Sequence, residues 1–463
     1  MASSLFRLKP VESETGHGEL KRSMGRMALL FFSIGSVIGS GIFVILGVAI
    51  PKAGPAVLLS FVLAAVAALF SALSYAEMAS AIPASGSSYS YAYVTLGELV
   101  AWVVGWMLML EYGVSVAAVA VGWGEYLNEF LSAFGITIPK EFASPPGDGG
   151  VFNIPALIVV LLCTLLLIRG ASESARWNSI MVMLKIAILL FFSAVAFTAF
   201  DGSNFAPFLP LGLAGVTAAA GQVFFSYIGF DAASTAGEEA KNPRKDLPIA
   251  IIGSLAVVTA LYLIVTLAAL GAQNWKLDEG QGSEAVLSTI ANTAVGGSWA
   301  GTLIALGAII SIFSVVLVTL YGQTRILFAM GRDGLLPKVF TRVSVRSQTP
   351  VWNTVIVAAL IAVPAAFVSL GQLAEATSIG TLGAFAVVNV GVIVLRKRRP
   401  DLPRGFKTPL FPLMPILGIL LILVIVAGLD PVTWLVFALW MAVGLVVYFG
   451  YSRRHSVLGR SGT

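Results

Sequence analysis

The sequence predicts an all-α, multipass membrane protein in which twelve transmembrane helices form two inverted repeats of five helices and a final pair. Three observations lead to this fold class. First, 58% of the residues are hydrophobic and only 11% are charged, whereas a soluble domain has about 25% charged residues. Second, the chain contains many apolar runs of about 20 residues, the length that crosses a bilayer as a helix. Third, two of these runs are interrupted at corresponding places in the two halves of the chain, a pattern of internal repeats.

The apolar runs define the spans, and the polar segments between them divide the chain. We expect the spans at residues 27–49, 55–80, 98–131, 152–169, 175–200, 212–236, 248–271, 298–329, 352–369, 374–395, 411–429 and 432–450. The first run is too long for a cleaved signal peptide, so the polar residues before it are expected to stay as a tail. A basic, proline-rich segment from Arg396 to Pro415 separates ten helices from the last pair. The predicted parts are therefore a tail at 1–26, repeats at 27–200 and 212–395, two helices at 411–450 and a tail at 451–463.

The distribution of Lys and Arg predicts the orientation in the membrane. With the N-terminus in the cytoplasm, 24 of the 28 basic residues fall on the inner side, and three (Lys52, Lys140 and Lys276) fall in outer loops. This bias satisfies the positive-inside rule, so we expect both termini in the cytoplasm and the protein in the plasma membrane. The net charge of +5 then reflects topology and does not predict a nucleic-acid partner. Because each repeat has an odd number of helices, the second must be inserted upside down.

The remaining basic residue, Lys185, lies in the middle of the fifth helix. It follows Arg176 by nine residues, which places it about 13–14 Å from the inner end of that helix. A charge at the bilayer centre costs at least about 2.5–3.5 kcal/mol, so such a residue needs a reason to be there. Lys185 is either a structural lysine neutralised by a buried acid or a residue that takes part in the function. We favour the second interpretation.

The first interrupted run is the segment from Ile34 to Phe43, which contains three glycines in seven residues. Each glycine weakens a helix by about 1 kcal/mol relative to alanine, so the cluster favours local unwinding. A helix that restarts near 39–41 exposes free N–H groups and the positive end of its dipole, which suits a carboxylate. Carbonyls freed near Ile34 suit an ammonium group. The alternative is that the glycines form a packing face between helices, and it is less favoured because a second run is interrupted as well.

The second interrupted run extends from Phe224 to Asp231. Carbonyls freed between Phe225 and Ile228 would add further acceptors for an ammonium group. Phe225 and Phe230 flank the interruption. Aromatic residues in a span usually serve in packing, but beside a cavity one of them, Phe225, could close over a ligand as a lid. A pocket with donors on one side and acceptors on the other fits a zwitterionic α-amino acid.

Acidic residues within the spans are candidates for carrying protons. Asp231 directly follows the second interruption, and a desolvated carboxyl group can become a proton carrier. Glu111, in the middle of the third helix, is either a gating or a structural residue. Glu77 and Glu375 are expected to be structural partners, and the pair Glu238–Glu239 to be solvated residues at a helix end.

No pattern in the sequence indicates an enzyme, a metal site or a cofactor. The two histidines, His17 and His455, lie in the tails, which leaves no histidine for a metal site or a catalytic triad within the membrane. The chain has no phosphate-binding loop of the kind that drives ATP-dependent pumps. Its one cysteine, Cys163, excludes an intrachain disulfide and is expected to pack as a small apolar residue.

Several motifs together resemble those of the amino acid–polyamine–organocation (APC) superfamily, over the chain from about Leu20 to the C-terminus. They are Gly39-Ser40-Gly41-Ile42-Phe43, the loop Ile82-Pro83-Ala84-Ser85-Gly86-Ser87-Ser88-Tyr89-Ser90-Tyr91, the segment Tyr227-Ile228-Gly229-Phe230-Asp231 with its exit from Glu238 to Pro243, and the segments Tyr321 to Arg325 and Gly331 to Pro337. Ser87 departs from the glycine that family members often carry. Within the superfamily, the chain most resembles the bacterial relatives of the cationic amino acid transporters.

The resemblance implies a leucine-transporter-type fold with discontinuous helices one and six. It also implies that amides at the first interruption hold a substrate carboxylate and that carbonyls at both interruptions hold its amino group. The binding residues are then expected to be Ile34, Gly39, Ser40, Gly41, Phe225, Ser226, Ile228, Phe230 and, for specificity, Thr319. Lys185 resembles a lysine of proton-dependent members whose ammonium takes the place of a sodium ion, so protons rather than sodium are expected.

We therefore expect a secondary active amino acid transporter that works by alternating access, with proton symport through Lys185, Asp231 and Glu111. One alternative is an exchanger without net proton coupling, and another is a sensor that binds amino acids without moving them. A channel is less favoured because the dispersed charges form no ring that would line a pore. The expected partners are a small-molecule substrate and the lipid bilayer. The sequence leaves the preferred side chain and the oligomeric state open, and a monomer is compatible with it.

Overall fold

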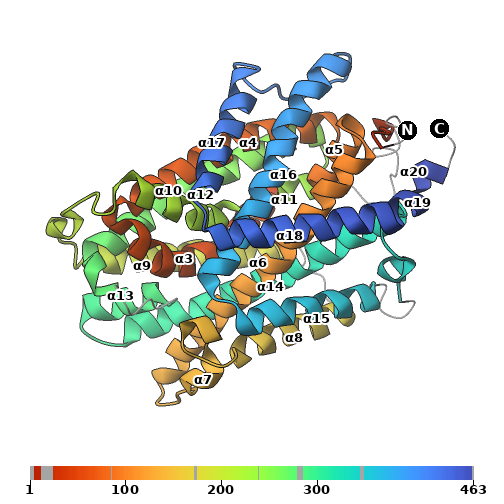
Figure 1. The fold of residues 1–463 in the computed structure, drawn as a ribbon. Coiled ribbons are helices and arrows are strands. Elements are labelled where there is room, and N and C mark those ends of the chain that lie inside the picture. The colour runs from red at the N-terminus through yellow and green to blue at the C-terminus, as the bar shows by residue number, and fades with distance from the viewer. Residues whose placement is uncertain are drawn as a thin grey trace.

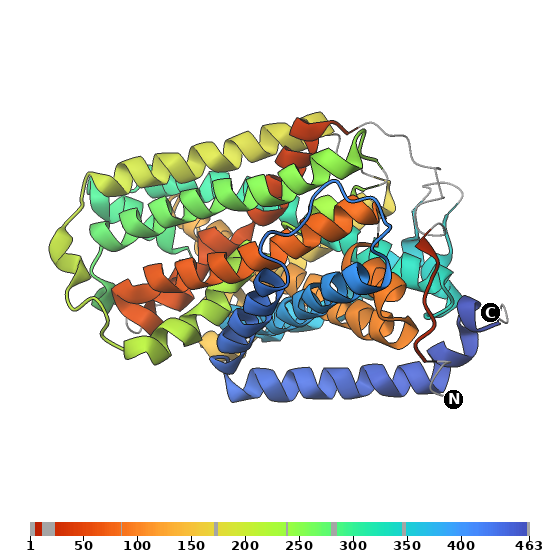
Figure 2. The same cartoon turned by 90° about the horizontal axis from the view of Figure 1, so that it is seen from above.

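A computed structural model of the chain describes residues 5–11, 24–84, 86–170, 175–237, 239–278, 285–344 and 349–460. Over these residues the protein is a bundle of helices that lie side by side (Figure 1), and its only extended pairing there is one bridge between Met24 and Ala240. Both ends of the chain lie at the same end of the bundle (Figure 1 and Figure 2), which we call the terminal end. Within the described ranges, eight helical segments are long and apolar enough to cross a membrane. The predicted all-α fold class is confirmed.

The first predicted span is broken where the sequence indicates. α2 (Arg26–Val37) ends before Ile38, and α3 (Ser40–Ala53) begins after Gly39. The N–H of Gly39 turns back to the carbonyl of Val37 at 2.7 Å, so the chain leaves one helix and enters the next within two residues. Residues 42–46 of α3 are completely buried, which places the second half of this span in the core of the bundle.

The sixth predicted span is also broken. α10 (Gly212–Phe224) continues into one 3₁₀ turn, η5 (Phe225–Tyr227), and a short helix α11 (Ala232–Thr235) follows after a gap. Gly229 in that gap has φ +114°, a conformation that L side chains rarely adopt, and a Cβ atom there would lie 2.6 Å from the carbonyl oxygen of Ser36. A glycine is therefore required where the two interruptions touch.

The other predicted spans each correspond to one helix. These are α4 (Val57–Ala81), α6 (Glu98–Ser132), α8 (Ile154–Ile168), α9 (Ala175–Phe197), α12 (Pro243–Ala272), α14 (Trp299–Arg332), α15 (Val351–Phe367), α16 (Leu370–Arg398), α17 (Leu413–Ala427) and α18 (Pro431–Val447). Short helices that hydropathy did not indicate lie between them or after them. They are α5 (Ser87–Thr95), α7 (Lys140–Ala143), α13 (Val286–Val295), α19 (Arg453–His455) and α20 (Val457–Arg460).

Two glutamates expected to be structural partners do pair with basic residues. Glu77 on α4 is fully buried and binds the guanidinium of Arg396 through both oxygens, at 2.7 and 2.6 Å. Arg404 lies 3.3 Å from the same carboxylate, which ties the segment after α16 to α4. Glu375 on α16 pairs with Lys52 at the end of α3, at 2.7 Å. Glu238, by contrast, lies outside the described residues.

Replacing Glu77 with glutamine is expected to destabilise the protein by about 3–5 kcal/mol, because it leaves Arg396 and Arg404 without their buried counter-charge. The thermal unfolding temperature of the purified protein in detergent measures this effect. Asp401→Asn is the matched control, since Asp401 pairs with Arg399 at an exposed position and such pairs contribute little. Equal melting temperatures for the two variants would contradict the assignment of Glu77 as a structural anchor.

Candidate functional site

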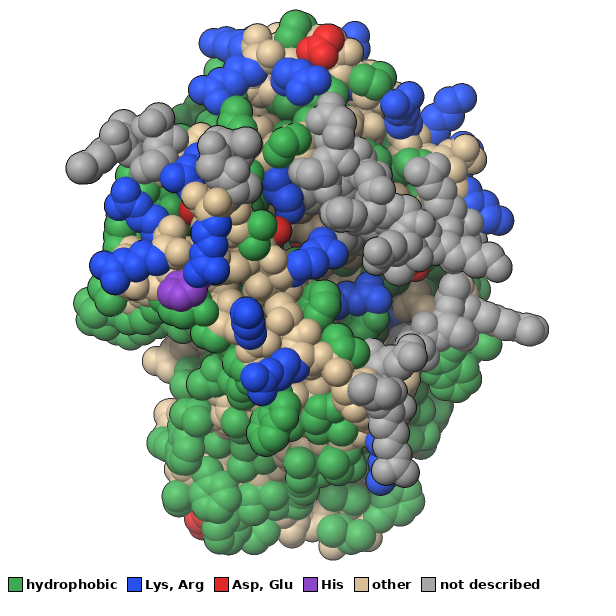
Figure 3. Space-filling view, turned by 90° about the vertical axis from the view of Figure 1, so that its right-hand side faces the viewer, with side chains coloured by type: hydrophobic (Ala, Val, Ile, Leu, Met, Phe, Trp, Pro, Cys, Tyr) green, Lys and Arg blue, Asp and Glu red, His purple; other side chains and the backbone are tan. Residues whose placement is uncertain are grey.

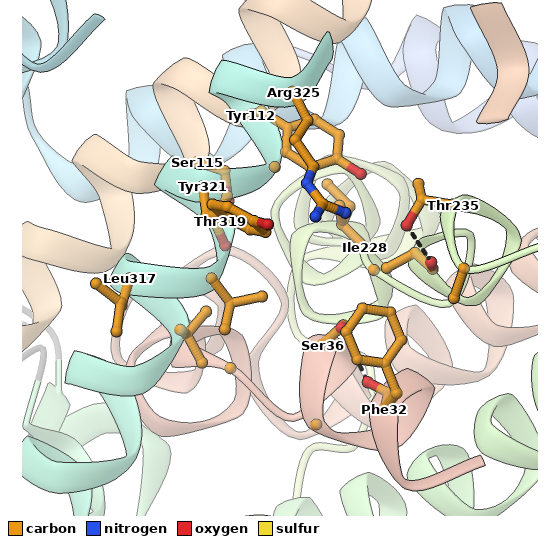
Figure 4. A pocket seen from close by; sticks show the side chains of 18 of the residues that line it. Phe32, Ser36, Tyr112, Ser115, Ile228, Thr235, Leu317, Thr319, Tyr321 and Arg325 are labelled. Carbon is orange, nitrogen blue, oxygen red and sulfur yellow. Dashed lines mark hydrogen bonds between the residues drawn. The ribbon is translucent and has the colours of Figure 1, made fainter. Parts of the chain in front are cut away.

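A cavity of about 650 Å³ lies beside the two interruptions. α2, α3 and the gap after η5 line one side of it, and α6, α9 and α14 line the other. In Figure 4, Phe32 and Ser36 on α2 face Thr319 and Tyr321 on α14 across this space. The lining continues to Met24, Glu239 and Arg332, so the cavity extends from the interruptions toward the terminal end.

The donor side of the cavity is the start of α3. Gly39 and Gly41 both line the cavity. Gly41 belongs to the first turn of α3, whose N–H groups have no carbonyl to bind within the helix. The N–H of Gly39 is already used by the carbonyl of Val37. Ser40 begins α3, and its side chain lies outside the described part of the structure.

The two interruptions also touch at Gly41. A Cβ atom on Gly41 would lie 2.4 Å from the Cα of Ser226, a distance at which backbone must move. Ser226 is buried against this contact, is not among the lining residues, and its hydroxyl has no hydrogen-bond partner within the described residues. Glycine at 41 thus keeps the backbone of α3 accessible from the cavity and lets helix six pack against it.

The acceptor side differs in part from the prediction. The carbonyl of Ile34 accepts a hydrogen bond from the N–H of Ile38 at 2.8 Å, and Ile34 does not line the cavity. Gly35, Ser36 and Val37 line it instead, because α2 continues to Val37. From the second interruption, Phe225 and Ile228 line the cavity, as does Thr319 from α14.

Phe230 takes a different place from the other predicted binding residues. Its ring is fully buried and packs against Tyr75 and Phe385, with centroids 5.8 and 4.9 Å away. Phe230 is not among the residues that line the cavity, whereas Phe225 lines it with 5% of its surface exposed. Of the two aromatic residues that flank the interruption, the structure therefore brings only Phe225 to the cavity.

Lys185 connects α9 to the first interruption. Its side chain is buried, with 2% exposed, and lines the cavity. Its Nζ donates a hydrogen bond to the carbonyl oxygen of Gly35 at 3.1 Å. Gly35 lies in the last turn of α2, where carbonyls lack partners within the helix. This hydrogen bond joins the end of α2 to α9.

Glu111 and Asp231 are buried near each other. Each has 1% of its surface exposed, and they are close enough to interact electrostatically. Neither carboxylate has a hydrogen-bond partner within the described residues. Glu111 lines the cavity and Asp231 does not. The structure thus brings the two predicted proton carriers together, with one of them open to the cavity.

The sequence prediction missed several lining residues on α6 and α14. Tyr112 and Ser115 follow Glu111 on α6 and face the cavity (Figure 4). Arg325 projects from α14 into it, over the ring of Tyr321 at 4.4 Å. Its guanidinium lies 3.9 Å from Glu239 across the cavity. The sequence analysis noted Arg325 only as part of a family motif and not as a residue of the cavity. Its position toward the end of a long apolar helix is the signal that would have indicated a role in the site.

A discontinuous pair of helices around a cavity, within a bundle of long apolar helices, defines a multipass membrane protein of the permease class. The family model described as amino acid permease matches residues 24–455 of the chain. The chain therefore belongs to the amino acid permease family.

Curated relatives agree with this assignment. A methylthioribose transporter and the branched-chain amino acid permease BcaP, both from Bacillus subtilis (strain 168), are each 45% identical to the chain over 99% of its length and all of theirs. Cationic amino acid transporter 4 of Homo sapiens is 34% identical over 87% of the chain and 64% of its own length. These relatives are named as transporters or permeases and not as enzymes, and they support the predicted relation to the APC superfamily.

Proposed function

We propose that the protein is a secondary active transporter that carries a small α-amino acid by alternating access. The observation that carries the proposal is the cavity between two interrupted helices, with free N–H groups of α3 on one side and the ends of α2 and η5 on the other. Donors suit the carboxylate of the amino acid, and helix C-terminal ends suit its ammonium group. Membership of the amino acid permease family supports the substrate class.

The proposal includes a topology of twelve spans in the plasma membrane. The helices before α10 and those from α10 to α16 then form two inverted repeats of five, 27–200 and 212–395, and α17 and α18 form the final pair. Lys and Arg gather on the terminal end while acidic residues are sparse there (Figure 3). By the positive-inside rule this end is cytoplasmic, so the cavity opens toward the cytoplasm. The structure then corresponds to an inward-facing state.

Coupling to protons, without sodium or another cofactor, is the second part of the proposal. The Nζ of Lys185 donates to the carbonyl of Gly35 near the end of α2, and its ammonium would take the place of the sodium ion that sodium-coupled relatives bind. Glu111 and Asp231 form the proton site, because two carboxyl groups buried close together, with no ion pair among the described residues, cannot both remain ionised. Protonation of the pair and the charge of Lys185 would together determine whether Lys185 binds the end of α2 or releases it.

The side chains of α14 and α6 that line the cavity determine which substrate binds. Apolar side chains line much of it, including Val119, Val315 and Val318, with hydroxyls at Ser115 and Thr319. This wall favours an uncharged, aliphatic side chain over a cationic one. Because two relatives of equal identity are named for different substrates, methylthioribose belongs in the test panel beside the amino acids.

Uptake into proteoliposomes tests the function. Purified protein should take up labelled aliphatic amino acids faster when the lumen is more alkaline than the outside, and dissipating the gradient should remove the stimulation. An exchanger would show counterflow but no stimulation by the gradient. A sensor would bind amino acids, seen as a rise in melting temperature, and move none of them. Uptake of methylthioribose alone would overturn the amino acid assignment.

A further inference from the structure

Four buried hydroxyls lie on helices that pack near the Glu111–Asp231 pair. They come from α4, α5 and α16, and none has a hydrogen-bond partner within the described residues. These are the hydroxyls of Tyr75, Ser88, Tyr91 and Ser378. Each of the two tyrosines is at least 99% buried. The pair and these hydroxyls together place many unsatisfied polar atoms in one region of the interior.

The tyrosine rings are fixed by aromatic packing. The ring of Tyr75 makes edge contacts with Tyr91 at 6.1 Å, Phe230 at 5.8 Å and Phe385 at 5.1 Å. Such contacts fix the direction of a tyrosine ring and therefore the position of its hydroxyl. The hydroxyl of Tyr75 lies beside Ser88 and within electrostatic range of Asp231 and Glu111. That of Tyr91 lies beside Ser234 and within range of Asp231.

Buried polar groups without hydrogen-bond partners destabilise the folded protein. Each costs about 1–3 kcal/mol, and native proteins bind nearly all of them to protein or to ordered water. A buried water needs two to four polar partners, and this region supplies hydroxyl donors and carboxylate acceptors from several helices. The hydroxyls of Tyr75 and Tyr91 make no hydrogen bond among the described residues. Ordered water that joined them to the carboxylates would satisfy both groups.

We propose that Tyr75, Ser88 and Tyr91 are positioning residues of the proton site: through ordered water, their hydroxyls hydrogen-bond the ionised carboxylate of the Glu111–Asp231 pair and so set the pH at which the pair takes up its proton. The inference rests on the proposed function, because it assigns neighbours to that proton site. Hydrogen bonds to an ionised carboxylate favour the charged form. The hydroxyls therefore allow the pair to release its proton at a lower pH than burial alone would permit.

Among the described residues, few groups face the pair. Tyr75 on α4, Tyr91 on α5 and Tyr112 on α6 are the titratable side chains that interact with it from the packed helices. From α16, the side chain beside Glu111 is the hydroxyl of Thr381. The basic residues Lys185 and Arg325 line the cavity onto which Glu111 opens. Tyr75 lies within electrostatic range of both carboxylates and is the first to test.

The test is the pH dependence of amino acid uptake by Tyr75→Phe and Tyr91→Phe, each of which removes a hydroxyl and keeps the ring. In each variant the midpoint of the pH profile should move to higher pH by about one unit, because a hydrogen bond that favours the ionised carboxylate of the pair is lost. Tyr126→Phe is the matched control: Tyr126 is fully buried on α6, but its hydroxyl donates to the carbonyl of Phe43. Its midpoint should not move.

Midpoints of the two variants equal to that of the wild type would overturn the inference while leaving proton coupling intact. A wild type whose uptake does not depend on pH would overturn both this inference and the proposed coupling, so the two failures are distinguishable. Counterflow at a fixed pH verifies that each variant is folded and binds substrate. If Tyr75→Phe fails this check, Tyr91→Phe and Ser88→Ala carry the same test, with the same upward shift expected.

Discussion

Replacing Lys185 with alanine is expected to reduce gradient-driven uptake by roughly 10- to 100-fold. The Nζ of Lys185 donates to the carbonyl of Gly35 at 3.1 Å, and a buried charge-assisted hydrogen bond contributes about 1.5–3 kcal/mol. Without it, no hydrogen bond from this position reaches the last turn of α2, and in the proposed mechanism the proton gradient can no longer act on that helix. The measurement is initial uptake into proteoliposomes with and without an imposed pH gradient.

Counterflow should persist in the Lys185→Ala variant, since the substrate is proposed to bind to main-chain atoms at the interruptions. The diagnostic quantity is therefore the ratio of gradient-driven uptake to counterflow. Lys140→Ala provides the control, because Lys140 is an exposed lysine outside the long helices. Undiminished gradient-driven uptake by Lys185→Ala would remove this residue from the coupling mechanism.

Gly41→Ala is expected to abolish transport or to lower it by roughly 100-fold or more. The added Cβ would lie 2.4 Å from the Cα of Ser226, so the first turn of α3 and η5 must move apart. That movement displaces the free N–H groups proposed to hold the substrate carboxylate, and close positioning of such donors is what gives them their effect. Uptake of the best substrate and its stabilisation of the protein against heat measure the two consequences.

Alanine variants of two other glycines provide the comparison for this prediction. A Cβ on Gly39 would lie 3.1 Å from a side-chain carbon of Val315, which can give way, so Gly39→Ala should cause a smaller loss. A Cβ on Gly113 of α6 would meet only a carbon of Ile361 at 3.9 Å, so Gly113→Ala should leave uptake near that of the wild type. Equal activity of the three variants would show that the contact between the interruptions does not matter for transport.

The sequence predicted both interruptions because their cause is local. Glycine and serine at 35–41 weaken a helix wherever it lies, and the structure breaks there, at Ile38 and Gly39. Which individual residues reach the cavity could not be predicted, because this depends on the exact residue at which each half-helix ends. α2 continues to Val37, so the carbonyl of Ile34 is used by the N–H of Ile38 and does not reach the cavity.

Other features of the site depended on packing that no local pattern contains. Phe230 follows Gly229, whose positive φ redirects the chain, and its ring enters an aromatic cluster with Phe385. Tyr112 and Arg325 line the cavity because of how α6 and α14 face each other. The short helices α5 and α13 were missed because hydropathy reveals long apolar runs and not helices of nine or ten residues.

The most direct test of the central claim is substrate protection of a single cysteine placed in the cavity. The native chain has one cysteine, the buried Cys163, so Cys163→Ala gives a background for Thr319→Cys on the cavity wall and for Ser132→Cys at an exposed control position. We predict that a thiol reagent labels position 319 and that a transported amino acid slows this labelling at concentrations near its KM, with no effect at position 132. Labelling of position 319 at the same rate with and without saturating substrate would contradict the account.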